Sequence, residues 1–164
     1  MPKLDAELAA FLNSGLSVIA ATRDARLLPE AIRLMALEAV AGEEEMTAFL
    51  PDAVSRRMLE NVRDNGRIAV VGSDPVDNRS VQVKGRAIDC RPATDLQRPV
   101  VDGYRARMAR ALAQVGVPQP VIFRAAFWPC HAVRFRVEGI FLQTPGPSAG
   151  NPFETLSPQG KGPQ

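Results

Sequence analysis

The sequence is poor in aromatic side chains, histidine and cysteine. Its 164 residues include one Trp, one Tyr, one His and two Cys. So few Trp and Tyr residues argue against the stacking platforms that bind single-stranded nucleic acid. The formal net charge is only +2, and the arginines are spread along the chain, which also argues against a nucleic-acid partner. A lone His131 with the widely separated Cys90 and Cys130 makes no zinc pattern, so we predict no metal site.

Long apolar runs are also missing. No stretch reaches the roughly 18 apolar residues of a membrane span, so we expect no membrane partner. Residues 1–15 carry acids among their apolar side chains, which is typical of neither a signal peptide nor a transit peptide. We therefore expect a cytoplasmic protein whose two cysteines are reduced thiols.

The length and the 46% apolar content are those of one folded domain with a proper core. We place this domain at residues 1–143. Residues 144–164 form a tail dense in Pro, Gly and Ser, in which we expect no regular structure and disorder over the last ten residues. The segment "QTPGPSAG" in this tail is either a loop that closes over a ligand or a tether along the domain.

Hydrophobic spacing and turn residues predict three helices and several short strands. The predicted helices cover residues 3–14, 53–64 and 93–116. The predicted strands outside residues 30–50 cover 16–23, 67–73, 79–90 and 131–143. The last two of these strands alternate apolar and polar residues, as half-buried strands do.

Residues 30–50 are ambiguous. Their Ala, Leu, Met and Glu content favours a helix, but their apolar residues form no helical stripe and Gly42 interrupts them. The competing reading is two antiparallel strands that turn at residues 41–45. The order of elements predicts a mostly antiparallel α+β domain, a small barrel with helices attached.

The stretch "SRR" at residues 55–57 lies at the start of the second predicted helix, with Asp52 as its expected N-cap. The first N–H groups of a helix lack internal partners and carry partial positive charge. A serine hydroxyl and two guanidinium groups would add donors there, which suits a phosphate group. The alternative is an ordinary solvated helix face.

The surrounding order of motifs resembles the pyridoxamine 5′-phosphate oxidase family of FMN-binding split barrels. In that family a serine followed by basic residues opens a helix that leads into the next strand, as in "SRRMLENVRDNGRIAV" here. A strand of the form Arg, polar, Val, polar, apolar, variable, Gly follows, as in "RSVQVKGRA" here. The resemblance covers residues 4–90 and, more loosely, 131–143. It implies a six-stranded or so split barrel, and on this basis we predict the strand pair within residues 30–50.

The resemblance also implies a cofactor, FMN, and residues that hold it. Ser55, Arg56 and Arg57 match the family's phosphate-binding segment, and Arg33 lies in the strand that supplies another basic contact. Three further positions are implied: Leu50 and Pro51, at a strand end along the flavin, and Ser80, where the family often has a glutamine. Gln82, two residues later on the same strand face, is a further candidate.

We therefore expect an FMN-dependent oxidoreductase whose catalytic residues and substrate are not named by the sequence. The resemblance further implies a homodimer with the flavin between two subunits. The segments "FWPCHAVRFR" and "FLQTPGPSAG" do not match the basic, histidine-containing ending of the true oxidases. The alternative function is a module on the same barrel that binds a flavin, a deazaflavin or haem without turnover. We expect Trp128 to pack in the core or at a dimer contact and His131 to make a structural hydrogen bond.

Overall fold

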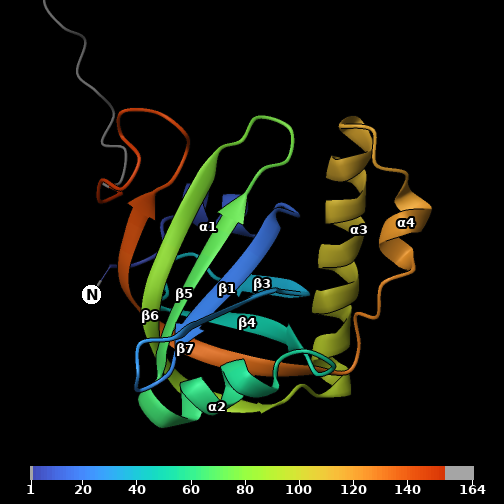
Figure 1. Cartoon of the computed structure of the whole chain (residues 1–164). Coiled ribbons are helices and arrows are strands. Elements are labelled where there is room, and N and C mark those ends of the chain that lie inside the picture. Colours follow the sequence, from blue (N-terminus) through green and yellow to red (C-terminus); the bar gives the residue numbers. More distant parts are fainter. Residues whose placement is uncertain (1, 154–164) are drawn as a thin grey trace, which may run out of the picture.

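A computed structural model describes residues 2–153 and shows one curled antiparallel sheet with helices around it (Figure 1). The sheet has seven strands in the order β2-β1-β5-β6-β7-β4-β3. The strands are β1 (Ser17–Arg23), β2 (Pro29–Arg33), β3 (Ala36–Ala39), β4 (Glu45–Pro51), β5 (Arg67–Ser73), β6 (Ser80–Pro92) and β7 (Cys130–Leu142). The helices are α1 (Ala6–Leu12), α2 (Arg56–Asn65), α3 (Arg98–Gln114) and α4 (Gln119–Phe123), with a 3-10 turn η1 (Asp95–Gln97) before α3.

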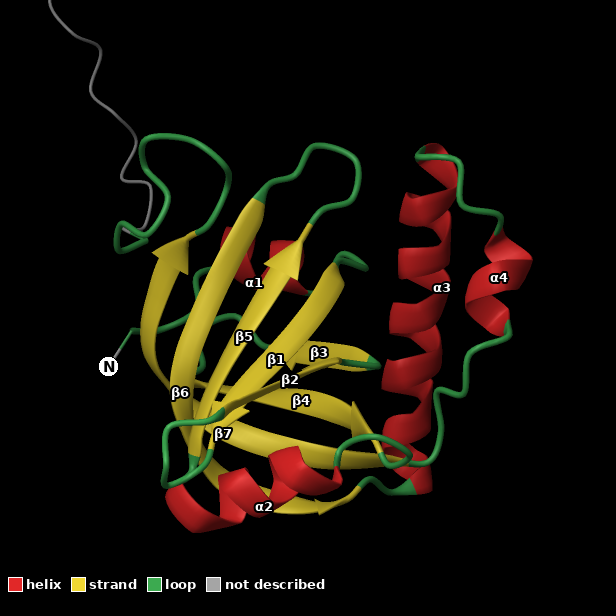
Figure 2. Cartoon of the chain, viewed as in Figure 1, coloured by secondary structure: helices red, strands yellow, loops and turns green. Residues whose placement is uncertain are grey.

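The sheet wraps around the apolar core, and helices cover its ends and one side. Figure 2 shows α2 across one end of the barrel and α3 with α4 standing beside it. Alternate residues of the central strands are buried in the interior, among them Val18, Val83 and Phe135. This period of two is the one expected for strands with a single buried face. The expected α+β split barrel is therefore confirmed, with seven strands rather than six.

The strand assignment within residues 30–50 is confirmed, against the helix propensity of those residues. β3 and β4 pair antiparallel, with Ala36 opposite Phe49 and Ala39 opposite Met46. All four of these side chains are buried, and burial on the sheet outweighs the local preference for a helix. The extra strand is β2, which pairs with β1 and is separated from β3 by only two residues.

The helix expected at residues 53–64 begins later, at Arg56, and its N-cap is Ser55. The prediction of Asp52 as the N-cap is therefore wrong: residues 52–54 form a turn, and the Asp52 N–H donates to the Pro129 carbonyl. α2 ends at Gly66, whose positive φ of 70° suits a glycine in a left-handed C-cap. The helix expected at residues 93–116 is η1 followed by α3, and the five-residue α4 was not predicted.

Residues 144–153 form turns and one isolated bridge, between Phe141 and Pro152. Their backbone returns to β7, where the Phe153 N–H donates to the Ile140 carbonyl. The start of the tail is thus fastened along the barrel. The predicted disorder of the last ten residues lies outside the described residues. Among the described helices, none combines the length and the apolar character needed to cross a membrane.

Candidate functional site

The candidate site is the junction between the end of β4 and the start of α2. Leu50 and Pro51 end β4, and both residues are buried. Each pairs with β7, Leu50 opposite His131 and Pro51 opposite Cys130. Four residues, 52–55, therefore connect the end of β4, which is fixed in the sheet, to the first turn of α2.

Ser55 is fully buried at the N-cap of α2, and among residues 2–153 its hydroxyl has no hydrogen-bond partner. Its backbone has φ −93° and ψ 0° rather than the extended conformation usual for an N-cap, and its side chain accepts no bond from the helix N–H groups. A buried hydroxyl left without a partner costs about 1–3 kcal/mol. An anion at the helix start would supply the missing partner.

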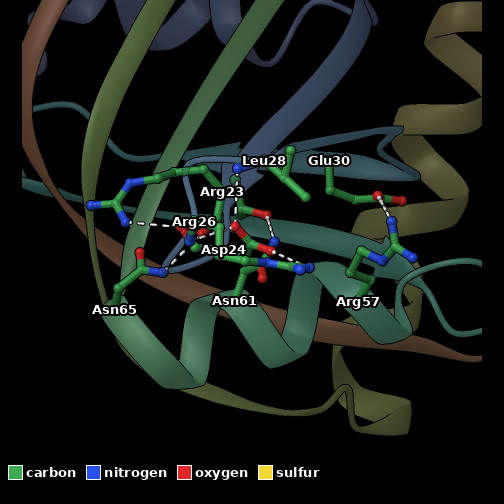
Figure 3. A network of polar contacts seen from close by, with 9 residues as sticks. Arg23, Asp24, Arg26, Leu28, Glu30, Arg57, Asn61 and Asn65 are labelled. Carbon is green, nitrogen blue, oxygen red and sulfur yellow. Dashed lines mark hydrogen bonds and ion pairs between the residues drawn. The ribbon is translucent and has the colours of Figure 1, made fainter.

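Arg56 and Arg57 are the first two helical residues and extend into solvent, with side chains 90% and 72% exposed. Arg56 Nη1 lies 3.8 Å from Glu60 Oε1 on the same helix, and Arg57 Nη1 lies 3.4 Å from Glu30 Oε2 on β2. Figure 3 shows the second pair at the α2 start, with Asn65 at the other end of the helix. Exposed ion pairs of this kind contribute about 0–1 kcal/mol, so both arginines can turn to an anion at little cost.

Asp52 and His131 form a pair beside this junction that sequence reasoning did not find. His131 Nδ1 lies 2.7 Å from Asp52 Oδ1, and both side chains are only partly exposed. The carboxylate fixes the orientation of the imidazole and leaves Nε2 for another contact. The expected structural hydrogen bond of His131 is present, but nothing in the sequence could indicate its partner 79 residues away.

The other predicted cofactor residues lie elsewhere on the single chain. Arg33 Nη1 donates to Ser17 Oγ at 2.9 Å on the outer face of β1 and β2. Ser80 is buried at the start of β6 and donates to Ser73 Oγ at 2.8 Å and to the Asn78 carbonyl.

Gln82 lies two residues further along β6, where its Oε1 accepts a 3.5 Å hydrogen bond from Gln143. The hairpin before β6 lies at the top of the barrel in Figure 1 and α2 at the bottom. One chain therefore brings together Leu50, Pro51, Ser55, Arg56 and Arg57, but not Ser80 or Gln82.

The site is built from anion donors rather than metal ligands. Within residues 2–153, no three His, Cys, Asp or Glu side chains gather in a way that could hold a metal ion. A phosphate group fits the donors at the start of α2. These donors are the unpartnered Ser55 hydroxyl, the N–H groups of the first helical turn and two guanidinium groups.

Comparisons with known proteins find the same fold at low sequence identity. A candidate pyridoxamine 5′-phosphate oxidase from Lactobacillus delbrueckii is 17% identical, with a TM-score of 0.54 over 85% of this chain and 93% of that one. An FMN-binding protein from Syntrophomonas wolfei is 10% identical, with a TM-score of 0.53 over 82% of each chain. An F420 reductase is 18% identical, with a TM-score of 0.53 over 85% of this chain and 98% of that one.

No protein-family model matches the chain, and no curated protein matches it either. At these identities the structural matches establish the fold, which is that of the pyridoxamine 5′-phosphate oxidase-like split barrels.

Proposed function

We propose that this chain, which has the pyridoxamine 5′-phosphate oxidase-like split-barrel fold, binds FMN and serves as a flavin-dependent oxidoreductase. The observation that carries the proposal is the buried Ser55 hydroxyl without a partner at the N-cap of α2. The likeness to an FMN-binding structure supports the choice of cofactor.

The start of α2 would hold the FMN phosphate. Ser55 would donate its hydroxyl, the first-turn N–H groups would donate along the helix axis, and Arg56 and Arg57 would supply positive charge. When bound, the isoalloxazine ring of FMN supplies the redox chemistry. The backbone of Leu50 and Pro51 would line the ring side of the site, and the Asp52–His131 pair offers an oriented imidazole nearby.

A second copy of the chain would complete the site. Ser80 and Gln82 lie far from α2 on their own chain, so they would contact the flavin bound to a partner. Arg33, on the outer face of the sheet, would likewise act across the interface. We accordingly propose a homodimer that joins through this outer face.

FMN titration tests whether the start of α2 binds the phosphate of FMN. The double variant Arg56→Ala/Arg57→Ala is expected to bind FMN about two orders of magnitude more weakly than the wild type. The reason is that each charge-assisted hydrogen bond contributes about 1.5–3 kcal/mol. Flavin fluorescence gives the dissociation constants, and urea unfolding checks that stability changes little.

The matched control is Arg110→Ala/Arg124→Ala, which removes two exposed arginines from α3 and the loop after α4. It is expected to bind FMN as the wild type does. Equal FMN binding by all three proteins, or binding by none, would contradict the proposal that the start of α2 binds the phosphate.

A deazaflavin is the second candidate cofactor, and the likeness to an F420 reductase favours its inclusion. Both cofactors carry a phosphate, so the same α2 variants report on either. Parallel titrations with FMN and F420 decide between them by the tighter dissociation constant. Haem, titrated in the same way and followed by its Soret band, tests the non-catalytic alternative.

A further inference from the structure

A cavity lies on the outer face of the sheet, at the barrel end that α2 covers. Its volume is about 400 Å³, enough for a small organic ligand. Three basic side chains line it, Arg23, Arg67 and Lys84, together with Glu138 and the ring of Phe141. We call it the basic groove.

Strand register explains why the groove exists. On the outer face, one row of paired residues contains Ile19, Val71 and Phe141, whose side chains stand up from the sheet. The next row contains Ala21, Ala69 and Gly139, which leave a shallow channel beside the larger side chains.

Gly139 also positions one wall of the groove. A Cβ added there would lie 2.9 Å from Phe141 Cε2, so a larger residue would displace that ring from its present position. Lys84 Nζ lies 4.7 Å from the centre of the same ring. The groove thus has an aromatic wall with a cation held against it.

The three basic side chains of the groove lack ion-pair partners in the part of the chain that the structure describes. Within residues 2–153, none of Arg23, Arg67 and Lys84 makes an ion pair with a carboxylate; Arg23 donates only to the Asp24 carbonyl, at 3.0 Å. The one acid in the lining, Glu138, lies 3.4 Å from Arg86 Nε, and Arg86 is not itself a lining residue.

Cross-strand pairing also places arginines next to one another on the outer face of the sheet. Arg67 on β5 lies directly opposite Arg86 on β6, which in turn lies opposite Arg136 on β7. Like charges directly opposite one another on a sheet are destabilising. Glu138 pairs with Arg86 and Glu45 pairs with Arg136. Arg67 has no such partner among residues 2–153, so a bound anion would offset its charge.

We propose that the basic groove binds a small anion with at least two negative charges, carried by phosphate or clustered carboxylate groups. Guanidinium groups bind both through paired hydrogen bonds, and the flat channel floor accepts a compact ligand body. The groove is distinct from the α2 start. Arg67 follows the C-terminal end of α2, whose ten residues span about 15 Å from the N-cap.

Calorimetric titrations with inorganic pyrophosphate and with citrate test the proposal at low ionic strength. The variant Arg67→Gln/Lys84→Gln is expected to bind at least one of them about tenfold or more weakly than the wild type. Arg110→Ala/Arg124→Ala, with the same change in net charge, is expected to bind as the wild type does. Without the anion, the groove variant is expected to melt no lower than the wild type, because like charges have been removed.

The two probes separate the ligand classes: tighter pyrophosphate binding indicates a phosphate ligand and tighter citrate binding a polycarboxylate. A wild type that binds neither probe would overturn the proposal, as would equal weakening in both variants. A repeat of the titration with saturating FMN tests whether the groove is a separate site. Displacement of the probe by FMN, with loss of FMN binding in the groove variant, would make the groove part of the flavin site and also overturn the proposal.

Discussion

At the scale of single residues, the two cysteines show how burial sets reactivity. Burial raises the pKa of the Cys130 thiol to about 12, with the nearby Asp52 charge acting in the same direction. Its Sγ donates to the Phe127 carbonyl at 2.8 Å. Burial also raises the pKa of Cys90, with Arg63 opposing the shift. Both thiols are free, as predicted, and their raised pKa values make each a poorer nucleophile at neutral pH than an ordinary cysteine.

Alkylation with iodoacetamide at pH 8 should therefore modify Cys90 slowly and Cys130 hardly at all. The thiolate fraction of Cys130 is about a thousandfold below that of an ordinary cysteine, because its pKa is about 12 rather than 9.0. Peptide mass spectrometry after timed quenching measures both rates. In guanidinium chloride the two sites should react alike, and fast labelling of Cys130 in the native protein would contradict the assigned burial.

The sequence predicted the serine and arginines at the start of α2, but it did not predict the Asp52–His131 pair beside them. "SRR" could be assigned to a helix start because capping and charge are local properties. The Asp52–His131 contact depends on β7 lying beside β4, which no local pattern encodes. Asp52 was predicted as a helix cap for that reason: its local sequence suits a cap, and its actual partner lies across the sheet.

At the scale of elements, a buried polar contact fixes α2 on the barrel. Asn61 Nδ2 on α2 donates to Thr22 Oγ1 on β1 at 3.0 Å, and both residues are buried. Figure 3 shows Asn61 on the helix face turned toward the β1–β2 hairpin. An amide between two apolar layers tolerates few orientations, so this bond sets how the helix start faces the sheet.

Thr22→Val removes the acceptor while keeping the side-chain shape and strand preference. The buried Asn61 amide then lacks a partner, which is expected to lower the free energy of unfolding by about 1–3 kcal/mol. Urea unfolding should show a lower midpoint with an unchanged slope. Adding Asn61→Leu to Thr22→Val should recover most of the loss. A single variant as stable as the wild type would show that this contact does not anchor α2.

Strands with an alternating pattern and helices with an apolar stripe were predicted where they occur, because a single buried face imposes its own period. For residues 30–50, hydrophobic periodicity did not decide between a helix and strands. β3 and most of β4 are buried, so their apolar residues run together without alternation. The assignment there came from the resemblance rather than from the residues. The extra strand β2 is partly exposed and only five residues long, too short to show a period of its own.

At the scale of the whole molecule, the outer face of the sheet is the surface that a second copy would cover. Ile19 is 45% exposed and lies directly opposite Val71, in the same row as Phe141. Apolar side chains grouped on one face of a sheet are typical of an interaction surface, and a two-fold dimer buries such a patch against itself. The basic groove lies toward the α2 end of the same face.

Sedimentation velocity at micromolar concentration is expected to give the mass of a dimer. Ile19→Lys should shift the population to monomer, because it replaces an exposed apolar side chain of this row with a charge. Val115→Lys, at the similarly exposed end of α3, serves as the control and should leave the dimer intact. A monomer mass for the wild type would contradict the dimer and, with it, a flavin site shared between two subunits.

The two outermost strands of the sheet, β2 and β3, are five and four residues long and follow one another in the chain. Between them, the Leu34 N–H donates to the Val18 carbonyl of β1 and the Met35 N–H to the Phe49 carbonyl of β4. The chain thus passes from the β1 side of the sheet to the β4 side within two residues. Short edge strands offer few backbone groups to a strand from another molecule, so this protein should resist edge-to-edge aggregation even when concentrated.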